Sequence, residues 1–380
     1  IKWIMICTVI QFVITFLFNT TAMTIQAYER FVFIRLCLII ACVLQPCINL
    51  LLLYHGGNVV TISVATLVIS FLTYVVYYCY AKKVLDLKYK FDNFDKNLFK
   101  NIFVFSAFLF LNTITDQLTF STDNIILGIF SGSIMVAIYS VGSNFKNYFM
   151  AFSTSASSVF APKINKIIAE SGSDDETNEI FIRIGRIQFY IVTLILLGYI
   201  FLGRQFVYLW VGNEYSDAYW IGLLLMISVY VPCFQNIGLE IQKAKNMHKA
   251  RSVVYFLIAI VNIIITIPLS LLYGGIGASF ATCLCMFIGT VIFMNIYNYK
   301  KVGIDIPAFW KSIFRILPGM IIPIVYGVFI NCFININSYW NLLFVILGFV
   351  LVYFLSCWFF SMNHYEKDIF SKPLKRFLKK

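Results

Sequence analysis

The run VFIRLCLIIACVLQPCINLLLLY, residues 32–54, carries a single charge, at Arg35. About 20 apolar residues in an α-helix are long enough to cross the hydrocarbon core of a bilayer. The run does not alternate apolar and polar residues, as a strand of a membrane β-barrel would over about ten residues. It therefore predicts a transmembrane helix, because a helix satisfies its own backbone hydrogen bonds inside lipid.

The rest of the chain repeats this pattern. Of its 380 residues, 61% are hydrophobic and 12% are charged, with a mean hydropathy of +0.85. Soluble domains average about 45–50% apolar and about 25% charged residues. We predict an all-α, polytopic membrane protein with eleven transmembrane helices, at about residues 3–25, 32–54, 58–80, 101–124, 133–160, 181–202, 218–239, 253–273, 276–298, 313–332 and 339–361.

Basic residues gather on one side of the predicted membrane. Of the 29 lysines and arginines, 26 lie in the breaks after the first, third, fifth, seventh, ninth and eleventh runs or at the run ends that border these breaks, whereas the opposite side holds only Lys2 and Arg204. The positive-inside rule assigns the basic side to the cytoplasm, together with the C-terminus. The net charge of +12 thus reflects topology and headgroup contact rather than a nucleic-acid partner.

Two stretches about 216–219 residues apart carry the same marks. Ile25-Gln26, Arg35, Tyr54 with Gly56-Gly57, and Lys82-Lys83-Val84 reappear as Ile241-Gln242, Arg251, Tyr273 with Gly274-Gly275, and Lys300-Lys301-Val302. Six predicted helices separate the two copies, and an even offset gives both copies the same orientation in the membrane. We interpret them as corresponding parts of two parallel halves, an arrangement that is common in transporters.

The repeat also predicts how the chain is organised. Residues 1–100 would form the last three helices of a first bundle and a cytoplasmic linker, residues 101–300 a second six-helix bundle, and residues 301–380 a terminal helix pair with a basic tail. The fourth to sixth predicted helices would have counterparts before Ile1. We therefore expect three further helices ahead of this residue.

Polar residues inside the apolar runs are the candidate functional residues, because a charge at the centre of a bilayer costs about 2.5–3.5 kcal/mol on insertion scales. In the run 101–124 they recur at helical spacing and share one face. The run 133–160 carries a second polar group around one lysine. The predicted cavity residues are Asn112, Asp116, Asp123, Ser143, Asn144, Lys146 and Asn147.

Two interpretations of these residues stay open. In the first, two helices line a hydrophilic cavity, where Lys146 meets an anionic group such as a lipid phosphate and Asp116 binds a coupling cation or proton, or orients sugar hydroxyls. In the second, the residues hold the two helices together through interhelical hydrogen bonds. Asp123 is predicted near the outer mouth, where it can also be simply solvated.

Residues that would support catalysis or a bound metal are scarce. The ten cysteines lie in apolar runs without a Cys-x-x-Cys spacing, and the three histidines form no cluster in the sequence. A membrane prenyl or glycosyl transferase would need clustered aspartates for Mg²⁺–diphosphate. The only aspartate pair, Asp174-Asp175, is predicted in a polar loop. We predict no resident cofactor and no enzymatic activity, with H⁺ or Na⁺ coupling left open.

Four stretches resemble a known family. They are Asp123-Asn124-Ile125-Ile126-Leu127-Gly128 with Gly132 and Tyr139-Ser140-Val141-Gly142; Leu209-Trp210-Val211-Gly212-Asn213-Glu214-Tyr215 with Ala218; the run from Gln242 to Asn262; and Tyr273-Gly274-Gly275-Ile276-Gly277-Ala278. Together they resemble the polysaccharide flippases of the multidrug/oligosaccharidyl-lipid/polysaccharide (MATE-like) exporter superfamily. Family members have fourteen helices, so the resemblance implies that this chain contains helices four to fourteen.

The resemblance implies that the chain flips an undecaprenyl-pyrophosphate-linked oligosaccharide across the bacterial inner membrane by alternating access, for O-antigen, capsule or exopolysaccharide. Arg35 and Arg251, near the cytoplasmic mouth, would attract the pyrophosphate, although topology and headgroup contact are the preferred explanation of both arginines. The implied partners are the lipid-linked oligosaccharide, membrane lipids, a polysaccharide polymerase and glycosyltransferases. A small-molecule or drug:cation antiporter of the same superfamily is the alternative.

Overall fold

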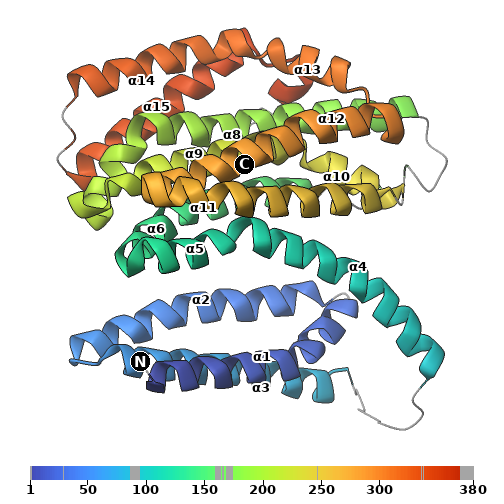
Figure 1. The fold of residues 1–380 in the computed structure, drawn as a ribbon, viewed down its shortest axis with the longest axis vertical. Coiled ribbons are helices and arrows are strands. Elements are labelled where there is room, and N and C mark those ends of the chain that lie inside the picture. The colour runs from blue at the N-terminus through green and yellow to red at the C-terminus, as the bar shows by residue number, and fades with distance from the viewer. Residues whose placement is uncertain are drawn as a thin grey trace, which may run out of the picture. The chain divides into compact units, whose positions relative to one another are not determined.

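The computed structural model describes residues 2–28, 30–85, 95–158, 164, 167, 174–245, 247–334, 336 and 338–368. Within these ranges the chain forms helices and no strand (Figure 1). Seven of the described helices are long and apolar enough to cross a membrane, and a bent pair makes an eighth span. The protein is an all-α, polytopic membrane protein, as its composition predicts.

Two compact units make up the chain, Ile1–Phe99 and Lys100–Lys380. The first is a three-helix bundle of α1 (Lys2–Ala27), α2 (Phe31–Tyr54) and α3 (Val59–Lys83). Two side-chain amides join its helices. Gln11 Nε2 donates to Ser70 Oγ over 3.1 Å, and Gln45 Nε2 donates to Thr66 Oγ1 over 2.6 Å. Such hydrogen bonds connect helices in lipid, where burying apolar side chains supplies little driving force.

In the second unit, α9 packs against α6, α8 and α11. The elements from the unit boundary onward are α4 (Lys96–Phe120), α5 (Thr122–Phe130), α6 (Gly132–Ser158), α8 (Asp174–Val211), η1 (Asn213–Tyr215), α9 (Asp217–Phe234), α10 (Asn236–Ala244), α11 (His248–Met286), η2 (Phe287–Phe293), α12 (Met294–Tyr297), η3 (Asn298–Val302), α13 (Ile306–Phe314), η4 (Leu317–Met320), α14 (Ile321–Phe333) and α15 (Tyr339–Phe360). The separation of this unit into a second bundle and a terminal pair stays a prediction.

A sharp break divides α11. Gly274 has φ +58° and ψ −137°, a backbone conformation that glycine adopts and residues with a side chain rarely do. The break falls at the Tyr273-Gly274-Gly275 mark of the sequence repeat, between the predicted helices 253–273 and 276–298. The helical stretch Arg251–Val302, with its break at Gly274, therefore contains two of the predicted spans.

Two local predictions need correction. The predicted run 101–124 is interrupted, because α4 ends at Phe120 and α5 begins at Thr122. Asp123 consequently lies in the first turn of α5. The predicted polar loop around Asp174-Asp175 is wrong, since α8 begins at Asp174. A carboxylate in the first turn interacts favourably with the helix dipole, which gives Asp175 a structural explanation.

Gly142 lets α6 approach α9 closely. A Cβ atom at this position would lie 2.9 Å from the Ala218 carbonyl oxygen and 3.0 Å from the Gly222 nitrogen. Small residues at such contacts allow membrane helices to pack backbone against backbone. The contact holds α6, which carries Tyr139 and Lys146, against the rest of the second unit.

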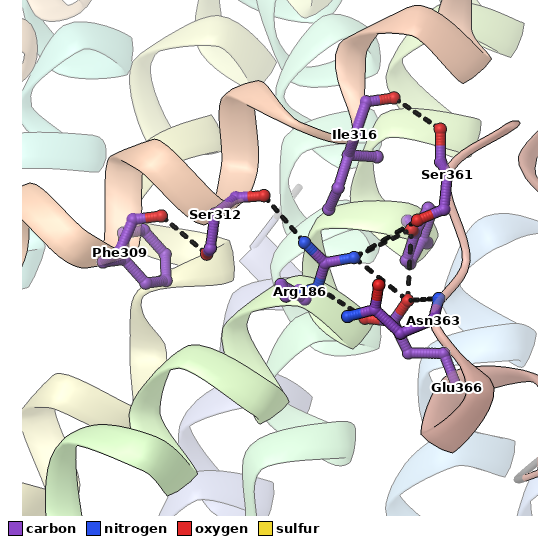
Figure 2. A network of polar contacts seen from close by, with 8 residues as sticks. Arg186, Phe309, Ser312, Ile316, Ser361, Asn363 and Glu366 are labelled. Carbon is purple, nitrogen blue, oxygen red and sulfur yellow. Dashed lines mark hydrogen bonds and ion pairs between the residues drawn. The ribbon is translucent and has the colours of Figure 1, made fainter. Parts of the chain in front are cut away.

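A buried ion pair fastens the segment after α15 to α8 (Figure 2). Arg186 Nε lies 2.5 Å from Glu366 Oε1, and Arg186 Nη2 donates to Glu366 Oε2 over 3.1 Å. The guanidinium also donates to the backbone carbonyls of Ser312 (2.7 Å) and Ser361 (3.3 Å). The two charged side chains are only 7% and 4% exposed. One arginine thus connects α8, α13 and the chain that follows α15.

Candidate functional site

A buried carboxylate lies where α5, α6 and α11 meet. Asp123 has 1% of its surface exposed. The Tyr139 hydroxyl of α6 donates to Asp123 Oδ2, and Thr282 Oγ1 of α11 donates to the same oxygen over 2.9 Å. Two consecutive helices and one that is distant in the sequence therefore meet at one carboxylate oxygen.

The polar cluster continues along α11. Asn262 Nδ2 donates to Thr282 Oγ1 over 3.2 Å, and Thr266 Oγ1 donates to Asn262 Oδ1 over 3.2 Å. All three side chains are buried. Asn262 and Thr266 are one turn apart and share a helical face. The break at Gly274 allows the second part of α11, with Thr282, to lie beside the first.

A buried lysine complements the carboxylate. Lys146 of α6 is 4% exposed and interacts electrostatically with Asp123. Tyr139 lies seven residues before Lys146, about two turns along the helix, so both side chains belong to one face. Removing a single charge from water is strongly unfavourable, and an opposite charge nearby offsets part of that penalty. The site thus combines one anion, one cation and neutral hydrogen-bonding groups inside an apolar bundle.

The oxygen atoms of this cluster fit a hard cation or a proton. The Asp123 carboxylate, Asn262 Oδ1 and the hydroxyl oxygens of Thr266 and Thr282 are ligand types that hard cations accept. All ten cysteines are free, and no group of three or more His, Cys, Asp or Glu side chains in the described ranges could hold a metal ion. The donor set therefore suits an oxygen-bound cation better than a transition metal.

Asp123 and Lys146 are the predicted cavity residues that the structure brings together. The solvated position considered for Asp123 is wrong, because the tertiary fold covers this carboxylate with α6 and α11. The side chains of Asn112 and Asp116 lie outside the described residues. Their part in a cavity stays a prediction.

The remaining predicted residues of α6 occupy other positions. Ser143 is half-buried and donates to the Ser140 carbonyl oxygen of its own helix over 3.0 Å. Asn144 and Asn147 are exposed on α6. These two amides are three positions apart and therefore lie on one face of α6, distinct from the buried face that carries Lys146.

Arg251 and Arg35 each line a polar cavity within their own unit. The cavity at Arg251 measures about 290 Å³ and also contacts Gln235, Gln242 and Asn298. The Arg251 guanidinium lies over the Tyr255 ring, 4.6 Å from its centroid. The cavity at Arg35 measures about 230 Å³ and lies between α1, α2 and α3.

Comparison with known proteins assigns the family. The sequence model of a family described as polysaccharide biosynthesis protein matches residues 2–219, more than half of the chain. The chain belongs to this family. A search of curated proteins found no match. The fold is similar to a solved structure titled "Lipid II flippase MurJ, inward closed conformation", with a TM-score of 0.69 and 18% sequence identity over 98% of this chain and 74% of that chain.

The buried polar residues of α11 in this polysaccharide biosynthesis protein were not predicted from the sequence as part of the site. Asn262, Thr266 and Ser270 recur every four residues inside an otherwise apolar run, and each is buried. A polar stripe at this spacing inside a transmembrane run was the available signal. Nothing in the sequence pattern indicates that the stripe faces Asp123.

Proposed function

We propose that this protein translocates an undecaprenyl-pyrophosphate-linked oligosaccharide across the bacterial inner membrane. The burial of two opposite charges, Lys146 and Asp123, is the observation that carries the proposal, because a membrane bundle tolerates such charges when they serve a pathway or a partner. Membership of a polysaccharide biosynthesis family supports a glycan cargo. The likeness to a structure titled as a lipid II flippase supports a lipid-linked one.

The proposed mechanism is alternating access, in which two helical bundles rock about a central polar cavity. The glycan and the pyrophosphate enter the cavity while the prenyl tail stays in lipid. Lys146 exchanges its attraction to Asp123 for the pyrophosphate as the cargo arrives. The chain makes and breaks no covalent bond in this cycle.

Polar residues on the exposed side of α6 supply contacts for the sugar. Asn144 and Asn147 are exposed, and each amide offers donors and acceptors to hydroxyl groups. Ser143 lies between this face and the buried one. Asn112 and Asp116 join the cavity in this proposal on the basis of their spacing in the sequence.

We propose that Asp123 is the coupling site for H⁺ or Na⁺. Its carboxylate is the negative group of a cluster whose other members supply neutral oxygen atoms. Binding of a cation there weakens the hold of Asp123 on Lys146, which frees the lysine for the cargo phosphate. In proteoliposomes, Asp123→Asn should remove the dependence of transport on the Na⁺ or H⁺ gradient. Transport that keeps its gradient dependence in this variant would exclude Asp123 as the coupling site.

The proposed setting is the bacterial inner membrane with a cytoplasmic C-terminus, as the distribution of basic residues indicates. A flipped lipid-linked oligosaccharide must be made on one side and consumed on the other. We therefore propose glycosyltransferases and a polysaccharide polymerase as the enzymes that act before and after this protein.

The central test replaces Lys146 in a strain that lacks its own copy of the gene. Lys146→Ala should abolish glycan export while the protein level in the membrane stays unchanged, whereas Lys146→Arg should keep part of the export because it keeps the charge. Export is measured as surface polysaccharide, and protein level by immunoblot. Full complementation by Lys146→Ala would remove Lys146 from the mechanism.

A drug:cation antiporter is the competing proposal, since the superfamily architecture and a buried aspartate suit both cargo types. Accumulation of labelled lipid-linked sugar in vesicles separates the two, because an antiporter would instead lower the susceptibility of cells to cationic drugs. An integral-membrane transferase is the weaker alternative. Its metal site would need clustered aspartates, and the pair Asp174-Asp175 opens α8 instead.

A further inference from the structure

Two cavities occupy matching positions of the sequence repeat. One lies in the first unit and one in the second, and six of the ten residues that line the first have a counterpart 216 positions later that lines the second. The four polar pairs among them are Asn19 and Gln235, Gln26 and Gln242, Arg35 and Arg251, and Tyr74 and Thr290. In three of these pairs both members are of the same kind, an amide or an arginine. The repeated residues therefore correspond to a duplicated polar cavity, in addition to indicating the same membrane orientation of both copies.

Each cavity is built at the same kind of helix junction. In the first unit, Gln26 lies in the last turn of α1 and Arg35 in the first turns of α2. In the second unit, Gln242 lies near the end of α10 and Arg251 in the first turn of α11. Both junctions adjoin a helix that ends in a lysine pair, Lys82-Lys83 in α3 and Lys300-Lys301 in η3.

Polar groups in the second-unit cavity lack protein partners. Gln242 is 1% exposed, and its Nε2 donates to Asn298 Oδ1 over 2.5 Å, which sets the orientation of the amide. Its Oε1 has no hydrogen-bond partner among the described residues, and neither does Gln235 Nε2. An unpaired buried polar atom is unfavourable by about 1–3 kcal/mol, so such atoms usually indicate a missing ligand or water.

Arg251 adds a positive charge to these groups. Its guanidinium lies against the Tyr255 ring, and within the described part of the chain no carboxylate forms an ion pair with it. A guanidinium that lies against an aromatic ring keeps its N–H groups available as hydrogen-bond donors. The cavity therefore presents donors on Arg251 and Gln235 and an acceptor on Gln242.

These groups together specify the chemistry of an occupant. The arginine and the amide N–H require an anionic oxygen acceptor, and phosphate oxygens match a guanidinium in geometry and charge. Gln242 Oε1 requires a donor such as a hydroxyl group. A volume of about 290 Å³ is several times the share of one water molecule, roughly 30 Å³, and admits a headgroup.

The first-unit cavity offers the same functional groups on side chains that are more exposed. Arg35 and Gln26 are exposed, and Asn19 and two tyrosines, Tyr74 and Tyr77, complete its polar lining. Its position beside Lys82-Lys83 corresponds to the depth at which basic residues meet lipid headgroups. The two cavities thus offer the same kinds of polar group.

We propose that each cavity binds a phosphodiester headgroup that carries hydroxyl groups, at the membrane surface marked by the lysine pairs. The phosphate pairs with Arg35 in one unit and with Arg251 in the other, and a headgroup hydroxyl donates to Gln26 or Gln242. The source is a hydroxylated anionic phospholipid or the phosphate end of a prenyl carrier lipid. This inference does not rest on the proposed flippase activity, because a protein with another cargo would hold the same headgroups.

Native mass spectrometry of the full chain in detergent tests the proposal. The probes are phosphatidylglycerol, phosphatidylcholine as a lipid without headgroup hydroxyls, and undecaprenyl pyrophosphate. Wild-type protein should retain two tightly bound molecules of phosphatidylglycerol or of the prenyl pyrophosphate, and fewer of phosphatidylcholine. Arg251→Gln and Arg35→Gln should each weaken one site by about tenfold or more, as expected for loss of a charged hydrogen bond, and the double variant should lose both.

Matched variants make the result specific. Lys243→Gln and Arg30→Gln remove charges at the same two junctions from residues that do not line the cavities, and should bind lipid as the wild type does. Gln242→Leu keeps the side-chain size, removes the acceptor and should weaken phosphatidylglycerol binding. Loss confined to one probe identifies the source of the phosphate. Unchanged binding of every probe in the double arginine variant, or equal loss in the two control variants, would overturn the proposal.

Discussion

Glu366→Ala removes the carboxylate that pairs with Arg186 at the junction of α8, α13 and the segment after α15. Breaking a buried pair on one side destabilises a protein by about 3–5 kcal/mol, because the remaining charge stays buried. Arg186 keeps its hydrogen bonds to the carbonyls of Ser312 and Ser361. We therefore expect a loss near the lower limit, about 3 kcal/mol of the free energy of unfolding.

The chain contains a matched control for this prediction. Arg183 and Glu179 form an ion pair one turn earlier in α8, with side chains that are 49% and 56% exposed. Exposed helix pairs of this spacing contribute about 0.3–0.5 kcal/mol, since water screens both charges. Glu179→Ala should accordingly change stability about six- to tenfold less than Glu366→Ala.

The assay is reversible unfolding of the purified chain in mixed dodecyl maltoside and SDS micelles, followed by helical circular dichroism. A double-mutant cycle with Arg186→Met measures the coupling directly. Arg186→Met/Glu366→Ala should be more stable than the sum of the single changes indicates, because neither charge is left unpaired. Equal losses for Glu366→Ala and Glu179→Ala, or strict additivity in the cycle, would refute the reasoning.

Further predictions follow from the contacts of the second unit and use the same unfolding assay. Gly142→Ala should destabilise by about 1–3 kcal/mol, because its Cβ would lie 2.9 Å from the Ala218 carbonyl oxygen. Gly128→Ala is the control, and its effect on stability should have the opposite sign. Its Cβ would lie 3.7 Å from its nearest neighbour, an ordinary contact, so the change should stabilise the helix by about 0.5–1 kcal/mol. Thr282→Val should lower stability by about 1–3 kcal/mol through the lost hydrogen bond to Asp123. A destabilised Gly128→Ala or a neutral Thr282→Val would contradict these assignments.

Many of the helices and the break in α11 could be predicted from the sequence, because each depends on residues that are close together in the chain. The apolar run 32–54 forms α2, and the Tyr273-Gly274-Gly275 mark falls at the break in α11. The interruption between α4 and α5 was not predicted, since nothing in the apolar pattern of 101–124 marks Ser121 as a boundary. The helical start at Asp174 was missed because acidic residues fit both a loop and a first helical turn.

The candidate site was accessible only in part. Asp123 and Lys146 were identified because a charge inside an apolar run is unusual whatever surrounds it. Asn262, Thr266 and Thr282 were not, because neutral polar residues are common as links between membrane helices. The hydrogen bond from Thr282 to Asp123 joins residues 159 positions apart, a separation that no sequence period connects.

The sequence by itself determined that this chain is a helical membrane protein, and it carried the repeat that relates Arg35 to Arg251. Both are properties of consecutive residues along the chain. About twenty consecutive apolar side chains, for example, decide whether a helix enters lipid. Only the tertiary structure decided that Asp123 is buried against Tyr139 and Thr282 rather than solvated. That outcome depends on how α5, α6 and α11 are rotated and packed, which is set by contacts such as the one at Gly142 and not by any single helix.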